Sequence, residues 1–135
     1  MPVEIKVTFP GAARVDAQYG DMKIVTNQDG TAPAPFALFL ASIGTCAGIY
    51  VKHFCDQRNI PADDIEIIQH METDPLTRLV GRINLEIKLP AGFPDKYREA
   101  VIRAADQCAV KKHLAQPPVI HVTADIAANA IVAVN

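Results

Sequence analysis

Residues 31–51 read TAPAPFALFLASIGTCAGIYV and carry no charged side chain. A helix accounts for this stretch if it begins near Pro35, where the missing N–H of proline costs nothing, and runs through Lys52 to about Arg58. Such a helix is apolar on every side, so it needs more cover than one small sheet supplies. The stretch therefore predicts a helix at the centre of the protein, and it indicates a second subunit.

A membrane span is the alternative for an uncharged run of this length. Pro33 and Pro35 stand at its start, and it is diluted with Ala, Gly, Ser and Thr rather than filled with Leu and Ile. The segments on either side have the pattern of ordinary globular strands. We therefore expect no membrane partner.

Strands and a second helix surround this segment in the sequence. Apolar and polar residues alternate from Val3 to Phe9, which is typical of a strand with one wet face. Similar patterns, turn residues and Pro94 at a helix start predict further strands at 14–19, 22–26, 64–71, 78–89 and 119–126, a helix at 94–114, and an extended tail at 129–135. The order βββ-α-ββ-α-β is an α+β layout in a single domain spanning 1–135.

The composition narrows the function classes. A chain of 135 residues with 50% hydrophobic and 21% charged side chains can form one compact domain with its own core. A net charge of -2 provides no basic field for a phosphate backbone, so we expect no nucleic-acid partner. The N-terminal residues show no secretory pattern, and we expect a cytoplasmic protein.

The three cysteines, Cys46, Cys55 and Cys108, are an odd number and form no C-x-x-C pair. The histidines do not repeat at zinc-ligand spacing. We therefore expect free or reactive thiols, not a disulfide framework or a metal site. A single cysteine on an apolar helix is most often a small packed residue, so periodicity alone leaves packing and redox roles open.

Small residues around Cys46 (Ser42, Gly44, Thr45 and Gly48) would let another element or a substrate approach it closely. Two runs then carry a family resemblance. PFALFLASIGTCAGIYVKHFC (35–55) and FPDKYREAVIRAADQCAVKKHL (93–114) resemble the two central helices of the OsmC/Ohr family, each of which carries one redox cysteine. The resemblance covers nearly the whole chain. It implies two long central helices packed on a curved antiparallel sheet in an intertwined homodimer.

The resemblance also implies an activity, that of a cysteine-based hydroperoxide reductase. Cys46 would attack the O–O bond of an organic hydroperoxide, or of hydrogen peroxide, and become a sulfenic acid. Cys108 would condense with it to a disulfide, and an external dithiol would restore both thiols without a bound cofactor. The expected partners are therefore a second copy of the chain, a small hydroperoxide and a dithiol reductant.

An apolar site raises the pKa of a thiol, so we expect a cation beside Cys46. Members of the family use an arginine from the N-terminal strands, usually held by a glutamate near the start of the first helix. Arg14 matches this arginine and is the only one before Arg58. The glutamate is missing, because Phe36 and Ala37 occupy the expected positions. Cys55, nine residues after Cys46, is expected to be a packed or partly exposed thiol.

Two other classes of function stay open. In one, the same fold serves as a stress-response or small-ligand-binding protein whose cysteines are largely inactive, and the missing glutamate favours it. In the other, the cysteines hold a metal or cluster across the dimer. The second is disfavoured because each helix offers only one well-placed ligand.

Overall fold

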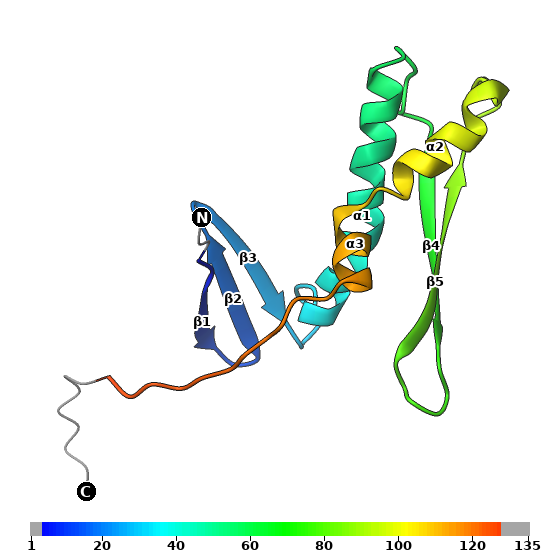
Figure 1. Ribbon diagram of the computed structural model, residues 1–135. Helices are drawn as coiled ribbons and strands as arrows, with labels where there is room; N and C mark the ends of the chain where they lie inside the picture. Colours follow the sequence, from blue (N-terminus) through cyan, green and yellow to red (C-terminus); the bar gives the residue numbers. More distant parts are fainter. Residues whose placement is uncertain (1–3, 128–135) are drawn as a thin grey trace, which may run out of the picture.

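The computed structural model describes residues 4–127. Its elements follow the predicted order as far as the second helix: three strands, a long helix, two strands and then helical segments. Figure 1 shows the first three strands and the later pair of strands on opposite sides of the long helix α1. The α+β class is therefore confirmed.

The N-terminal strands form an antiparallel meander in the order β1-β2-β3. They run Lys6–Gly11, Arg14–Tyr19 and Met22–Asn27, and Gly20, at φ 56°, makes the turn between the last two. The register pairs Val7 with Ala17 and Ala17 with Ile24, so these apolar side chains share one face. Val7 and Ile24 are both exposed. One apolar face of this sheet is thus largely uncovered.

Helix α1 spans Pro35–Asp56 and begins with proline in its first turn, as predicted. One stripe of the helix is buried and contains Ile43, Ala47, Val51 and Phe54. These residues recur every three or four positions, which is the spacing of one helical face. Phe36, Phe39 and Ile49 on other faces are exposed. By length and composition α1 could cross a membrane, but core helices of soluble proteins pass the same test.

Strands β4 (Glu66–Thr73) and β5 (Val80–Lys88) form an antiparallel hairpin, close to the predicted ranges. Ile67 lies opposite Ile87, and both contact the core cluster around α1. The predicted turn at Asp74 is also present, since its carboxylate accepts hydrogen bonds from the backbone N–H groups of Leu76 and Thr77 at 2.8 and 3.0 Å.

The prediction of a single second helix over 94–114 is wrong. The chain forms a 3-10 turn η1 (Asp95–Tyr97), then α2 (Arg98–Ala105), then α3 (Ala109–Ala115) after a break. Cys108 lies in this break with φ -49° and ψ 126°, outside the helical region. Ala105 at the end of α2 and Cys108 in the break are both buried in the core. The change of direction at this point allows α3 to contact α1. Asp106, a poor residue for a helix interior, pairs with Lys111 across the break.

The predicted strand at 119–126 is not formed, and the expected single curved sheet is instead two separate sheets among the described residues. Residues 117–127 form neither helix nor strand. The side chains of Val119, Ile120, Val122 and Ile126 are 80–94% exposed. A strand needs a partner edge for its backbone groups, and this segment, which passes below the meander in Figure 1, pairs with neither sheet among the described residues. The predicted tail at 129–135 lies outside the described residues.

Candidate functional site

Cys46 lies midway along α1 and is partly buried. The backbone N–H of Val110, with a smaller contribution from that of Ala109, hydrogen-bonds to its sulfur. Both donors belong to the first turn of α3, where N–H groups have no partner within the helix. These bonds lower the pKa of Cys46 against the opposing effect of its partial burial.

Cys108 sits immediately before that turn and is 2% exposed. Its sulfur lies 3.9 Å from the carbonyl oxygen of Ile43 in the preceding turn of α1. Burial raises the pKa of Cys108, and the neighbouring sulfur of Cys46 raises it further, although the backbone N–H groups of Lys111 and Val110 act in the opposite direction. The presence of Cys108 in turn lowers the pKa of Cys46. The fold therefore brings the two predicted cysteines together and makes one of them the better thiolate.

The source of this stabilisation differs from the sequence-based expectation. An apolar surrounding and an arginine were expected to set the pKa of Cys46, whereas the largest effect that lowers it comes from the backbone N–H of Val110, and no cation of residues 4–127 contributes. The break in the second helix creates these donors, because an unbroken helix would have used the N–H groups of Ala109 and Val110 internally. The only sequence signal for the break is Asp106-Gln107, which is weak.

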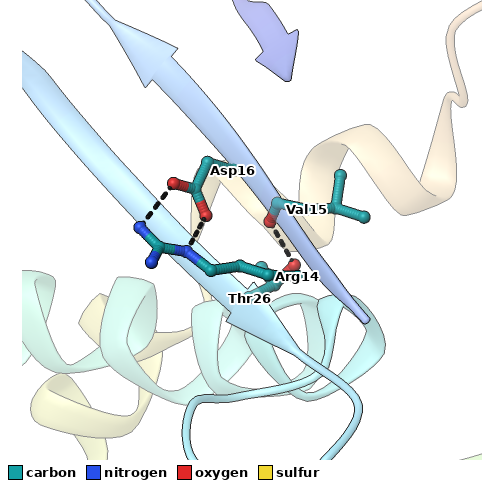
Figure 2. A network of polar contacts seen from close by, with 4 residues as sticks. All are labelled: Arg14, Val15, Asp16 and Thr26. Carbon is teal, nitrogen blue, oxygen red and sulfur yellow. Dashed lines mark hydrogen bonds and ion pairs between the residues drawn. The ribbon is translucent and has the colours of Figure 1, made fainter. Parts of the chain in front are cut away.

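Arg14 lies on β2, as predicted, but its guanidinium pairs with Asp16. Figure 2 shows the two-pronged contact, with Nε at 2.9 Å from Oδ1 and Nη2 at 2.8 Å from Oδ2 of Asp16. The Asp16 side chain is 3% exposed and that of Arg14 is 40% exposed. The hydrogen bond with Arg14 lowers the pKa of Asp16. The described contacts of Arg14 do not include Cys46, so its role at the thiolate stays a prediction.

Asp16 is a residue that the sequence reasoning missed. It supplies a carboxylate for Arg14 from the same strand, at a distance of two residues, where side chains point to one face. That spacing was the available signal. A hydrogen bond of 2.6 Å from Thr26 to the carbonyl of Val15 ties β3 to β2 beside this pair (Figure 2).

The small residues before and after Cys46 make room for strand β4. The side-chain amide of Gln69 donates to the carbonyl oxygen of Leu40 at 2.9 Å. A Cβ atom at Gly44 would lie 2.7 Å from Oε1 of Gln69, whereas one at Gly48 would meet Ile67 at an ordinary 3.8 Å. The close neighbour at these glycines is thus a strand of the same chain.

Cys55 is fully buried in the core, and burial raises its pKa. It packs with Val51, Phe54 and Val101, as expected for a structural thiol. Arg58 closes this end of α1 by stacking on the ring of Phe54 at 3.7 Å and bonding the carbonyl of the same residue.

A cavity of about 490 Å³ opens beside Cys108, between strand β5, helix α2 and helix α3. Its walls are mostly aliphatic, with three charged side chains among the lining residues. The lining includes Ile43, Ile83, Leu85, Ile87, Leu89, Arg98, Ile102, Asp106, Cys108, Lys111 and Leu114. Cys46 is not among the residues that line it.

The site thus pairs a partly buried cysteine of lowered pKa with a second, buried cysteine, an arrangement in which thiol chemistry is possible. A family model described as OsmC-like protein matches residues 28–123. The chain belongs to this OsmC-like family. No curated protein matches the chain.

Solved structures share the fold at low sequence identity. A Psychrobacter arcticus protein with a proposed role in osmotic stress and detoxification is 24% identical, with a TM-score of 0.64 over 83% of this chain and 87% of that one. An OsmC-like protein from Mycoplasma pneumoniae is 13% identical, with a TM-score of 0.64 over 85% and 88%. A hypothetical protein from Aquifex aeolicus is 18% identical, with a TM-score of 0.63 over 87% and 89%.

Proposed function

We propose that the protein is a thiol-dependent reductase of hydroperoxides, with Cys46 as the attacking thiolate and Cys108 as the resolving thiol. The observation that supports this most is the unequal pair of neighbouring sulfurs. The N–H groups of Val110 and Ala109 favour the thiolate at Cys46, and burial raises the pKa of Cys108. The family membership supports the same role.

In the first step the Cys46 thiolate attacks the distal peroxide oxygen, the O–O bond breaks, and the leaving alkoxide takes a proton to become an alcohol. Cys46 is then a sulfenic acid. The Cys108 sulfur attacks the sulfur of Cys46, and the hydroxyl leaves as water once the S–H proton has been transferred to it. A disulfide remains, and a dithiol must supply two electrons and two protons to reset the site.

The test uses one equivalent of cumene hydroperoxide on the reduced protein. We expect one intramolecular disulfide between Cys46 and Cys108, detected by non-reducing peptide mapping. Cys46→Ser should abolish peroxide consumption with dithiothreitol, whereas Cys55→Ala should retain it. A Cys46 that stays reduced after the treatment would refute the proposal.

Arg14 is proposed to assist at Cys46 from the N-terminal sheet, and Asp16 holds its guanidinium in one orientation. Arg14→Ala should slow the reaction with hydroperoxide, while Lys23→Ala on the next strand provides a matched loss of one exposed positive charge. Equal second-order rate constants for the two variants would remove Arg14 from the site.

We further propose a cytoplasmic homodimer. Two apolar surfaces are uncovered in the single chain: the exposed side of α1, with Phe36, Phe39 and Ile49, and the face of the β1–β3 meander that carries Val7 and Ile24. Exposed apolar surface of this kind is typical of a subunit interface.

The alternative of a ligand-binding protein with inactive cysteines is favoured by one observation, the cavity of about 490 Å³ beside Cys108. It predicts that Cys46→Ser binds an apolar probe such as 1-anilinonaphthalene-8-sulfonate as tightly as the native protein does, and that neither consumes peroxide.

A further inference from the structure

The cavity between β5, α2 and α3 is a hollow with aliphatic walls. Its volume of about 490 Å³ lies within the roughly 300–1,000 Å³ of small-molecule sites. Ile83 and Ile87 of β5, with Leu89 just after that strand, form one wall. Ile102 of α2 and Leu114 of α3 also line the cavity, although their side chains are 50% and 51% exposed. Water therefore covers apolar surface here, and a ligand with an apolar body would displace it.

The charged side chains of the cavity are not all compensated within the described part of the chain. Lys111 forms an ion pair with Asp106, so the charges of these two lining residues offset each other. Arg98, the first residue of α2, is exposed and takes part in none of the ion pairs formed among residues 4–127. A guanidinium presents its N–H groups as a fork that matches a carboxylate. The cavity thus combines aliphatic walls with a guanidinium that is available to a ligand.

We propose that this cavity binds a medium-chain carboxylate, a small amphiphile whose carboxylate contacts Arg98 and whose alkyl chain lies against Ile83 and Ile87. Neither redox sulfur takes part in the binding. The proposal therefore goes beyond the hydroperoxide reductase function and holds whether or not the cysteines react. A neutral molecule of the same length would bury the same chain but leave the guanidinium without an anionic acceptor, so the carboxylate should bind more tightly.

A second copy of the chain is the other occupant to weigh for an apolar hollow. The surfaces proposed for the subunit contact are the side of α1 with Phe36, Phe39 and Ile49 and the face of the meander with Val7 and Ile24. None of these five residues lines the cavity. The position of the cavity therefore favours a small molecule as its occupant.

The headgroup is tested by isothermal titration calorimetry of the reduced protein with octanoate and with 1-octanol. Octanoate should bind the native protein more tightly than 1-octanol does. Arg98→Gln should weaken octanoate binding by about three- to tenfold, between the effects of an exposed and a shielded ion pair, and leave 1-octanol binding unchanged.

The matched control for the headgroup is Arg103→Gln. It removes an exposed arginine of the same helix that does not line the cavity, and it should change neither affinity. Equal octanoate affinities of Arg98→Gln and Arg103→Gln would overturn the proposal. Equal affinities of the native protein for octanoate and 1-octanol would do the same.

The position of the ligand is tested with a second pair of substitutions on α2. Ile102→Trp puts a larger side chain at the wall of the cavity, whereas Arg103→Trp adds the same side chain at the next, exposed position. Octanoate affinity should fall by about tenfold or more in the first variant and stay unchanged in the second. Circular dichroism shows whether both are folded. Equal octanoate affinities of the two folded variants would exclude the cavity as the site.

Two further measurements separate this proposal from the dimer and from the reductase. Sedimentation velocity should give the same oligomeric state with and without octanoate. A dimer that dissociates when octanoate binds would show that a second copy occupies the cavity, and it would overturn the proposal. Cys46→Ser should bind octanoate as tightly as the native protein does. Octanoate binding as described, in a native protein that consumes no hydroperoxide, would refute the proposed function alone.

Discussion

Cys46 and Cys108 are the same functional group in two different surroundings. Backbone N–H groups at the start of α3 lower the pKa of both sulfurs, but at Cys108, which is 2% exposed, burial has the larger effect and raises the pKa. A sulfur that accepts several N–H groups is favoured as an anion, and a sulfur without water is favoured as a thiol. The division of work between nucleophile and resolving group can therefore arise from backbone geometry.

This difference predicts the order in which the cysteines react with an alkylating reagent. As pH rises, Cys46 should become reactive with iodoacetamide before Cys55 or Cys108, because its pKa is lowered and theirs are raised. The measurement is the alkylation rate of each cysteine-containing peptide against pH. Cys108→Ala removes one group that lowers the pKa of Cys46, so this pKa should rise in that variant. Simultaneous titration of all three thiols would contradict the assignment.

Asp16 predicts a pH-dependent contribution to stability. Its folded-state pKa is lowered by the hydrogen bond from Arg14, so its stabilising effect is present above the unfolded pKa of about 3.9 and is lost as pH falls through the folded value. Asp16→Asn should therefore be less stable than the native protein at pH 7, with a gap that narrows below pH 4. Urea midpoints at the two pH values measure it.

The matched control for that experiment is Asp21→Asn, at an exposed turn of the same sheet. A gap between Asp16→Asn and the native protein that stays constant from pH 7 to pH 3 would show that the carboxylate charge does not matter there.

At the scale of the elements, α1 and β4 lie close together because α1 has glycines, Gly44 and Gly48, where it faces the strand. Gly44 allows Oε1 of Gln69 to lie where a Cβ would otherwise be, and this allows the amide of Gln69 to reach the carbonyl of Leu40. The two glycines of α1 cost helix stability, about 1 kcal/mol each relative to alanine. The contact at Gly44 offsets part of that cost, and it fixes the register between the helix and the hairpin.

The two glycines should therefore respond differently to alanine. Gly48→Ala meets Ile67 at an ordinary distance and should stabilise the protein by about 0.5–1 kcal/mol. Gly44→Ala must displace the anchored Gln69 side chain, losing a hydrogen bond worth about 0.5–1.5 kcal/mol, so its net gain should vanish or reverse. Denaturant unfolding measures both. Adding Gln69→Ala should make the Gly44→Ala change stabilising, and equal effects of the two glycine substitutions would argue against the close contact.

Local pattern correctly predicted the meander, α1 and the hairpin, but it also predicted a strand at 119–126 that is not formed and one helix where the chain forms η1, α2 and α3. Pro35 and the uncharged run predicted α1, and the alternation of apolar and polar residues predicted the hairpin. The break at Cys108 is associated with the packing of Val101, Ala105 and Cys108 against α1. The hydrophobic periodicity of the local sequence contains no signal for this tertiary contact. The neighbouring cysteines were expected only through the family resemblance, and the pairing of Arg14 with Asp16 was not expected.

At the scale of the whole molecule, the single chain is unusually open. The meander stands to one side of α1, the hairpin to the other, and the segment after α3 runs outward (Figure 1). The buried core is confined to the contact between α1, α2 and the hairpin. A second copy covering the apolar faces would complete the hydrophobic burial that this arrangement leaves unfinished.

The homodimer proposal predicts that a charge on the apolar face of the meander separates the subunits. Ile24→Asp should lower the dimer association constant, because burying one such side chain contributes about 1.5–3 kcal/mol and a two-fold symmetric interface carries the change twice. Lys23→Asp, on the opposite face of the same strand, is the control. Sedimentation velocity over a concentration series distinguishes them. A monomer at every concentration of the native protein would end the proposal.

The exposed segment after Pro118 has a consequence for the handling of the protein. Val119, Ile120, Val122 and Ile126 are β-prone and apolar, and their backbone groups pair with no strand of the part of the chain that the structure describes. A bare strand of this composition pairs readily with any open sheet edge, including that of an unrelated or misfolded chain. Newly made monomers should therefore be the species that aggregates, and overproduction at low temperature, which slows synthesis, should raise the soluble yield.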